Sequence, residues 1–242
     1  MEKFTNTILM NNAIIKLEGV DLFQMDHQVF SNISLSINKG EFLYLIGETG
    51  SGKSSLLKTL FGEIQSSAGN ITVSTFNLNT ISAKEIPLLR RKLGIVLQEP
   101  KLLKDRTVNE NISFAMEVLG FAPGEIKTQV NQLLSLVGIE YEAYKYPEQL
   151  SSGQQTRVAI ARALASKPLV LLCDEPTGNL DPELSSKIVV LLEKINRAGT
   201  TVIMATHDSG IVNRRKKRII ELDTGKMVRD EDRGRYNFSG DA

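Results

Sequence analysis

Short runs of apolar, β-prone residues alternate along this chain with longer segments in which apolar residues recur at helical spacing. The short runs predict strands near residues 13–20, 33–37, 42–46, 71–76, 95–98, 169–173, 201–205 and 218–222. The longer segments predict helices near residues 53–61, 108–119, 125–137, 157–165 and 185–197. Strands that alternate with helices in this way favour a mainly parallel sheet with helices packed on it. The expected fold class is therefore α/β.

The pattern changes between residues 100 and 165, where helical spacing continues and no convincing strand interrupts it. This stretch is a candidate helical subdomain inserted into the α/β core. We expect one folded domain over residues 12–228, preceded by a flexible N-terminus at 1–11. The last residues, 229–242, are rich in charge and are expected to form a disordered tail.

Composition narrows the classes of partner. The 242 residues carry 29 Lys and Arg against 28 Asp and Glu, so a net charge of +1 gives no general attraction to nucleic acid or anionic lipid. The single cysteine, Cys173, excludes an intramolecular disulfide and is expected to be a small buried apolar residue. No apolar run approaches the roughly 20 residues of a membrane span, and residues 8–10 are too short for a secretory signal. We expect a cytosolic chain that reaches a membrane only through a partner.

A glycine-rich loop between a predicted strand and a predicted helix carries the strongest chemical signal. Residues 47–54 read GETGSGKS and match the pattern G-x-x-x-x-G-K-[ST]. Glycines allow successive backbone N–H groups to converge on phosphate oxygens, and the following helix directs its N-terminal dipole at the same anion. Lys53 is predicted to reach the β- and γ-phosphates, and Ser54 to ligate Mg²⁺; the alternative is a simple glycine-rich turn. The predicted nucleotide-binding residues of this loop are Gly47, Glu48, Thr49, Gly50, Ser51, Gly52, Lys53, Ser54 and Ser55.

Two carboxylates follow the apolar run at 169–173, at the strand end where α/β sheets bind ligands. Asp174 suits the Mg²⁺ shell, and Glu175 suits the orientation and deprotonation of an attacking water. The alternative is that both residues only open the loop at 176–178.

Polar residues at three further points could contact the same nucleotide, but each also has an ordinary structural explanation. Ser151 and Gln154 have the spacing of a helix-capping box, and they could instead present a second helix N-terminus to a phosphate. Gln98 and His207 follow predicted strands at the expected ligand edge, and each could equally be an ordinary surface or helix-start residue.

Together these segments resemble the nucleotide-binding subunit of ABC transporters, from about residue 14 to 228. In chain order they match Walker A at 47–54, the Q-loop at Gln98, the signature at 150–154, Walker B ending at Asp174 and Glu175, the D-loop at 179–181 and the H-loop at His207. The resemblance implies a P-loop NTPase core with a mainly parallel sheet, an antiparallel β portion at the N-terminal side and an inserted helical subdomain. It also implies an ATPase that uses ATP and Mg²⁺.

The resemblance assigns roles within a head-to-tail homodimer that closes on two ATP molecules. It implies that Glu175 is the general base, that His207 holds the γ-phosphate and that Gln98 touches Mg²⁺. Phe23 would stack on adenine, although it could also be a core residue. The residues implied to complete the ATP site across the dimer are Ser151, Gly153, Gln154 and Asp181. Ser152 departs from the usual L-S-G-G-Q, and its side chain could crowd the closed dimer or supply a hydroxyl donor.

Finer resemblance points to a subgroup. Residues 174–181 are similar to the lipoprotein-releasing, macrolide-export and cell-division ATPases, and residues 90–96, 102–108 and 204–208 look most like the cell-division members. This implies an FtsX-like integral membrane partner at the cytoplasmic face of the bacterial inner membrane, with indirect membrane contact and no nucleic acid. The alternatives are a lipoprotein-releasing or macrolide-export ATPase and, less favoured by charge and length, a soluble ABC protein acting on ribosomes or DNA.

Two surface features bear on how a membrane is reached. Apolar residues of the helical insert are predicted to dock a short helix of the partner: Leu102, Leu103, Phe114 and Leu119. The basic cluster at 214–218 is either a solvated helix end or a contact for anionic headgroups.

Overall fold

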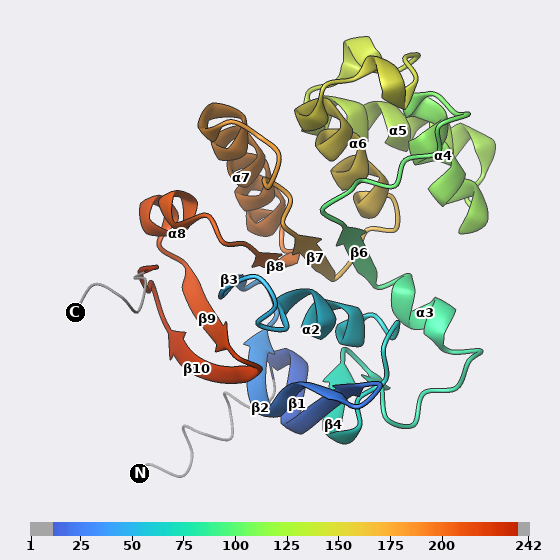
Figure 1. Cartoon of the computed structure of the whole chain (residues 1–242). Coiled ribbons are helices and arrows are strands. Elements are labelled where there is room, and N and C mark those ends of the chain that lie inside the picture. Colours follow the sequence, from blue (N-terminus) through green and yellow to red (C-terminus); the bar gives the residue numbers. More distant parts are fainter. Residues whose placement is uncertain (1–11, 237–242) are drawn as a thin grey trace, which may run out of the picture.

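A computed structural model describes residues 12–236 of the chain (Figure 1). The elements follow in the order β1 (Ala13–Gln24), β2 (His27–Asn38), β3 (Phe42–Ile46), α2 (Lys53–Leu60), β4 (Ala68–Val73), β5 (Phe76–Asn77), α3 (Ile86–Arg90), β6 (Leu93–Val96), α4 (Val108–Val118), α5 (Pro123–Val137), η2 (Glu140–Glu142), η3 (Pro147–Gln149), α6 (Ser152–Leu164), β7 (Val170–Asp174), α7 (Pro182–Arg197), β8 (Thr201–Ala205), α8 (Ser209–Arg215), β9 (Arg218–Asp223) and β10 (Lys226–Glu231).

The strands form two sheets. The larger sheet has the order β10-β9-β3-β8-β7-β6, and every neighbouring pair in it is parallel except β10 with β9. The smaller sheet, β2-β1-β4-β5, is antiparallel throughout. This arrangement confirms the expected α/β class, with a mainly parallel sheet and an antiparallel portion near the N-terminal side.

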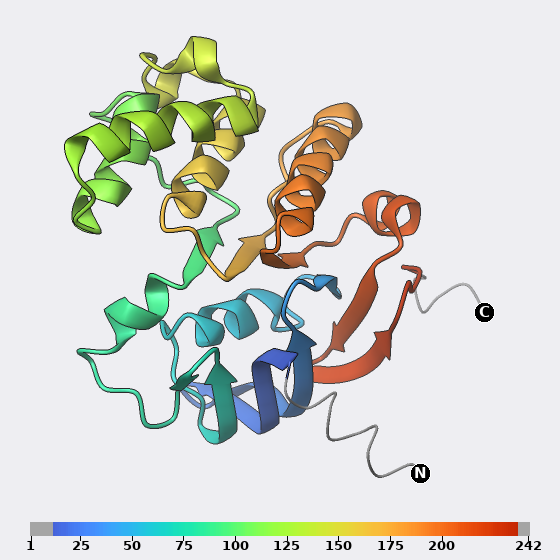
Figure 2. The same cartoon turned by 180° about the vertical axis from the view of Figure 1, so that it is seen from behind.

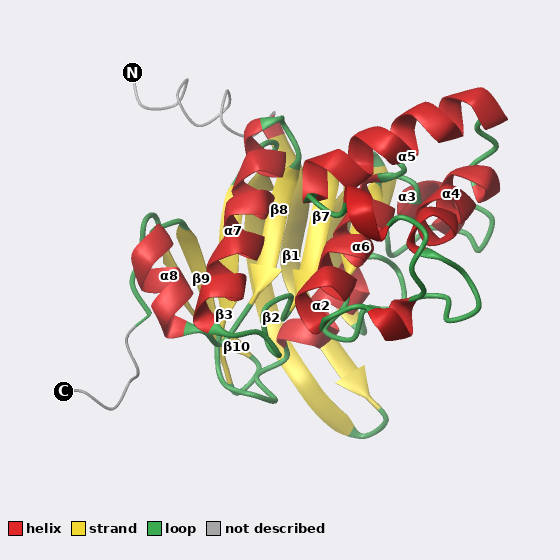
Figure 3. Ribbon diagram, turned by 90° about the horizontal axis from the view of Figure 1, so that it is seen from above, coloured by secondary structure: helices red, strands yellow, loops and turns green. Residues whose placement is uncertain are grey.

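Side chains that alternate along the parallel strands build a separate core on each face of the larger sheet. On β3, Phe42 and Tyr44 pack toward α4, α5, α6, α7 and α8, whereas Leu43 and Leu45 pack toward α2 and the antiparallel sheet. Figure 3 shows the strands of the larger sheet running behind α7. Because parallel strands share one direction, the carboxyl ends of β3, β7 and β8 meet at a single edge.

The helical insert stands beside the larger sheet, as the view from behind shows (Figure 2). Residues 100–165, all of which the structure describes, contain α4, α5 and α6 with the short 3-10 helices η2 and η3, and no strand. The N-terminus of α4 is closed by a capping box between Thr107 and Glu110. Across residues 12–236, no helix has both the length and the apolar character that a membrane span requires.

The predicted tail at 229–242 is wrong for its first part. Strand β10 continues to Glu231, and Tyr236 is buried, with its N–H donating to Asn213 Oδ1 at 2.7 Å. Part of the charge that suggested disorder is paired, since Arg229 contacts Glu221 on the neighbouring strand at 2.8 Å and Asp230 contacts Arg218 at 2.7 Å. The rest of that tail, 237–242, and the predicted flexible N-terminus, 1–11, lie outside the described residues.

The basic cluster at 214–218 is used largely within the fold. Arg215 and Lys217 both contact Glu193, at 3.2 and 3.4 Å, and Arg218 bridges Glu41 and Asp230 at 2.8 and 2.7 Å. Three of the basic side chains are therefore paired within the fold, which neither prediction, a solvated helix end or a headgroup contact, had anticipated.

Candidate functional site

The glycine-rich loop joins β3 to α2 and leaves the start of α2 open. A Cβ at Gly47 would collide with the carbonyl oxygen of Leu222, and Gly52 has φ 103°, so glycine is required at both positions. Gly52 is the N-cap of α2, and no side chain among the described residues caps that helix. Its first N–H groups therefore remain for an anion.

Lys53 lies folded back on the same loop. Its Nζ donates to the carbonyl oxygens of Gly47 and Glu48 at 2.7 and 2.8 Å, and the side chain is buried. Burial lowers the pKa of Lys53, while the carboxylates of Glu175 and Asp174 act against that shift. The amine thus has only neutral carbonyl partners and nearby negative charge, which suits it to exchange those carbonyls for phosphate oxygens.

The two predicted metal ligands meet across the site. Ser54 Oγ, on the first turn of α2, donates to Asp174 Oδ1 at the end of β7, at 3.0 Å. A hydroxyl and a carboxylate are the hard oxygen ligands that Mg²⁺ prefers. Over residues 12–236, no three His, Cys, Asp or Glu side chains gather into a metal cage. The donor set therefore fits a cation that also takes oxygens from phosphate and water.

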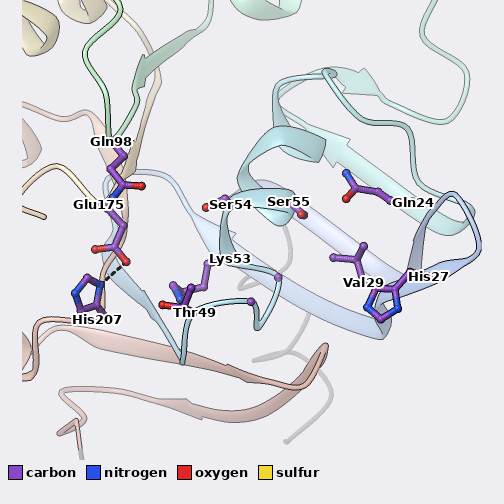
Figure 4. A pocket seen from close by; sticks show the side chains of 12 residues that line it. Gln24, His27, Val29, Thr49, Lys53, Ser54, Ser55, Gln98, Glu175 and His207 are labelled. Atoms are coloured by element: carbon purple, nitrogen blue, oxygen red, sulfur yellow. Dashed lines mark hydrogen bonds and ion pairs between the residues drawn. The ribbon is translucent and has the colours of Figure 1, made fainter.

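Glu175 is held in an unusual backbone conformation beside His207. Glu175 has φ 47°, which is uncommon for a residue other than glycine, and its side chain is about nine-tenths buried. His207 Nδ1 lies 2.8 Å from Glu175 Oε1, and the dashed line in Figure 4 marks this contact. Such local strain is typical of functional sites. The contact therefore holds the Glu175 carboxylate beside the cavity that both residues line.

One cavity of about 370 Å³ connects these groups. Gln98, Glu175 and His207 lie at one end, and the loop and α2 line its middle (Figure 4). The predicted residues that line it are Thr49, Gly50, Gly52, Lys53, Ser54, Ser55, Gln98, Glu175 and His207. Gly47, Glu48 and Ser51 belong to the same loop without lining the cavity, and the Ser51 hydroxyl is buried with no partner among the described residues.

The predicted residues of the signature and D-loop lie outside this cavity. Ser151 and Gln154 form a capping box at the start of α6, and Gln154 Nε2 also donates to Glu142 at 3.0 Å. Gly153 is buried in the first turn of α6, and Asp181 caps α7 by accepting from the N–H groups of the first turn. Within one chain these residues have structural roles, and their contact with the ATP of a second copy stays a prediction.

The predicted contact of Phe23 with adenine stays a prediction. Phe23 is 47% exposed and does not line the cavity, whereas its neighbour Gln24 does, together with His27 and Val29. The pairing of β1 with β2 changes register between Leu22 and Phe23, and a shift of one residue sends a strand side chain to the opposite face. The motif argument missed Gln24, His27 and Val29; strand alternation could have found them only if that irregularity were known.

Ser152 points toward the loop after β7. Its Oγ donates to the carbonyl oxygen of Asn179 at 3.5 Å, in an exposed position. A hydrogen bond at this limiting distance is weak. In the single chain, the extra hydroxyl therefore adds only a loose link between α6 and the D-loop.

Two residues that sequence reasoning missed anchor the segment after Gln98. Asn111 is fully buried on α4, accepts from Leu103 N at 2.8 Å and donates to the carbonyl oxygen of Leu103 at 3.0 Å. Arg162 on α6 donates to the carbonyl oxygens of Pro100 and Lys101, at 2.6 and 2.8 Å. These bonds tie the polypeptide that leaves the cavity at Gln98 to two helices of the insert. Helical periodicity carries no signal for such contacts, because they depend on the path of a loop.

The chain is similar in sequence to known proteins. The family described as ABC transporter matches residues 30–178. The curated relatives include the "Cell division ATP-binding protein FtsE" of Streptococcus pneumoniae, which is 48% identical over 206 residues that cover 85% of this chain and 90% of the relative. The proteins of that name from Bacillus subtilis and Escherichia coli are 47% and 42% identical, over 86% and 83% of this chain and 92% and 90% of their own lengths.

Solved structures show the same fold. The dimeric ATP-binding cassette MJ0796 bound to ADP and phosphate superposes with a TM-score of 0.82 at 32% identity, and the match covers 92% of this chain and 100% of that one. CbiO1 of Clostridium perfringens, described as part of an ABC transporter complex, has a TM-score of 0.85 at 33% identity, with 92% and 89% covered.

Proposed function

The chain belongs to the ABC transporter family of ATPases, and we propose that it hydrolyses ATP for an FtsX-like integral membrane partner in bacterial cell division. The observation that carries the proposal is the cavity that gathers Lys53, Ser54, Gln98, Glu175 and His207 from separate elements. The identity of 42–48% to cell division ATP-binding proteins supports the biological process. We place the chain at the cytoplasmic face of the inner membrane, held there through the partner.

The groups in the cavity suit the transfer of a phosphoryl group to water. Lys53 would leave the carbonyl oxygens of Gly47 and Glu48 and bind the β- and γ-phosphates, while the open N-terminus of α2 binds the same anion. Ser54, Asp174 and Gln98 would hold Mg²⁺, which when bound offsets the charge of the phosphates. Glu175 would accept the proton of the attacking water, and His207 would orient that carboxylate and contact the γ-phosphate.

We further propose that two copies associate head to tail around two ATP molecules. Ser151, Gly153 and Gln154 stand at the N-terminus of α6, away from the cavity of their own chain, and so are available to the ATP of a second copy. Asp181 begins α7 at the edge of the same surface. MJ0796, a structural relative of this chain, is a dimer.

A groove between the core and the helical insert is the proposed contact for the membrane partner. It holds about 550 Å³ and is lined by apolar side chains from α4 and the loop before it: Leu103, Phe114, Val118 and Leu119. Phe114 and Val118 are 37% and 64% exposed. Arg90 and Arg91 also line it, which favours a short partner helix that combines apolar side chains with an acidic one. Leu102, predicted to share in this contact, lines a different cavity.

Association with membranes tests this proposal. Val118→Asp is expected to reduce recovery of the chain with the membrane fraction, because it puts a charge into the apolar groove, while ATP hydrolysis by the purified chain stays unchanged. Val190→Asp, at a 42% exposed valine of α7, is the matched control and is expected to behave like the wild type. Equal membrane recovery for both variants would argue against the groove.

Depletion in the host tests the process. Loss of the chain is expected to give elongated or chained cells with normal lipoprotein sorting. Normal division together with lipoproteins retained in the inner membrane would instead support the lipoprotein-releasing alternative.

A further inference from the structure

The groove beside β6, the edge strand of the larger sheet, is bordered mainly by positive charge. In the described part of the chain, the charged residues that line this groove or directly adjoin a lining residue are one glutamate, Glu117, and six basic residues, here named the groove cations: Arg90, Arg91, Lys92, Lys104, Arg162 and Lys167. They come from α3, the loop before α4 and the end of α6, which are separate in the sequence. The fold therefore gathers this charge around one apolar surface.

The groove cations are not neutralised within the chain. None of them forms an ion pair with a carboxylate of residues 12–236. Arg90 donates to the carbonyl oxygens of Phe61 and Gly62, at 3.1 and 3.2 Å, and Arg162 binds two carbonyl oxygens in the same way. Carbonyl partners are neutral, so both guanidinium groups keep their charge. The basic cluster at 214–218 differs, because three of its side chains pair with carboxylates.

Most of this charge is also accessible. Arg91 and the three lysines among the groove cations are exposed. Asp105 follows Lys104, but Arg106 comes next and its guanidinium lies 4.3 Å from the centre of the Phe114 ring, which lines the groove. A net charge of +1 gives the whole chain little attraction to anions, so any attraction must come from a local excess such as this one. One acidic side chain on a partner helix would offset only a small part of it.

We infer that the groove cations bind anionic phospholipid headgroups directly, beside the partner helix that occupies the groove. The inference rests on the proposed function: a partner helix that enters the groove comes from the bilayer, and the border of the groove is then the part of this chain nearest to the headgroups. Each basic side chain near an anionic membrane surface raises partitioning by about fivefold. The lipid contact adds to the attachment through the partner.

Cosedimentation of the purified full chain with protein-free vesicles tests the inference. The chain is expected to bind vesicles of phosphatidylcholine mixed with phosphatidylglycerol, to ignore vesicles of phosphatidylcholine alone, and to dissociate at high salt because salt screens the attraction.

Two pairs of substitutions locate the contact. Arg91→Glu combined with Lys104→Glu is expected to weaken binding at least about 25-fold, from two cations at about fivefold each. Lys39→Glu combined with Lys127→Glu is the matched control, because both lysines are exposed, do not line the groove and give the same change in net charge. The control pair should bind like the wild type, and circular dichroism should show an intact fold in both.

Other outcomes would overturn the inference. One is a wild-type chain that binds neither kind of vesicle, or binds both equally. Another is an equal loss of binding in the two pairs of substitutions, which would assign the attraction to net charge. A third is binding of a labelled RNA in place of phosphatidylglycerol vesicles, lost in Arg91→Glu with Lys104→Glu, which would assign the surface to nucleic acid.

Failure of the proposed function has a different signature. A chain that hydrolyses ATP and requires Val118 for recovery with host membranes, yet ignores phosphatidylglycerol vesicles, would overturn the lipid contact alone. A chain that binds these vesicles through the groove cations but hydrolyses no ATP would contradict the proposed function.

Discussion

Replacement of Asn111 by alanine should destabilise the protein far more than a surface position on the same helix would. The side chain is fully buried and makes four hydrogen bonds to the backbone of the loop before α4. Its Oδ1 accepts from Leu103 N, and its Nδ2 donates to the carbonyl oxygens of Leu103, Arg106 and Thr107. Alanine would remove all of these partners at once.

The magnitude follows from the group left unpaired. A buried N–H without a partner costs about 1–3 kcal/mol, and the Leu103 N–H loses its acceptor in this variant. The carbonyl oxygens are less costly, because carbonyls have two lone pairs and tolerate incomplete pairing better. We therefore expect the free energy of unfolding to fall by about 2–3 kcal/mol, which corresponds to a fall in Tm of roughly 5–10 °C for a chain of this size.

Thermal unfolding followed by circular dichroism measures this effect. Asn109→Ala, two residues earlier on α4, is the matched control and should change the stability by about 0.5 kcal/mol or less. A Tm for Asn111→Ala within about 2 °C of that control would refute the reasoning that these hydrogen bonds hold the segment after Gln98.

Two further predictions concern the ATP site. Lys53→Ala is expected to abolish binding of Mg·ATP, because it removes the cation that we propose binds the β- and γ-phosphates. Calorimetry measures the affinity, with circular dichroism to show an intact fold, and unchanged affinity would contradict the site. Ser152→Gly is expected to leave ATP hydrolysis unchanged or raise it, because the bond to Asn179 is exposed and long at 3.5 Å. A phosphate-release assay measures the rate, and a large loss would show that the hydroxyl contributes to the site.

Motif spacing predicted which residues meet around the glycine-rich loop, for a physical reason. Lys53 and Ser54 must directly follow the loop that ends β3, and Asp174 and Glu175 must follow a strand buried on both faces. Parallel strands then bring their carboxyl ends together without further information. Ser54 and Asp174 are distant in the sequence, and this arrangement of the strands brings them within 3.0 Å of each other.

The hairpin and the tail were harder to predict, because their structure depends on pairing between strands. The resemblance places Phe23 at adenine; the pairing of β1 with β2 changes register beside Leu22, Phe23 does not line the cavity, and its contact with adenine stays a prediction. Charges after residue 228 suggested disorder, yet Arg229 pairs with Glu221 on the adjacent strand. Composition identifies neither the position of Phe23 nor the ion-pair partner of Arg229. Both depend on how neighbouring strands are paired, and the sequence pattern leaves that register open.

The central claim is that Glu175 activates water for ATP hydrolysis in a site that two copies of the chain close. Glu175→Gln keeps the size and hydrogen-bonding capacity of the side chain and removes its basicity. We expect the rate of ATP hydrolysis to fall by roughly 10²–10⁴-fold.

The decisive measurement combines that rate with size-exclusion chromatography of Glu175→Gln with and without ATP, at high protein concentration. Glu183→Gln, at an exposed glutamate of α7, serves as the control and should hydrolyse ATP like the wild type. The account predicts that Glu175→Gln is nearly inactive and elutes as a dimer only when ATP is present. Hydrolysis within about twofold of the wild-type rate, or a monomer under both conditions, would contradict it.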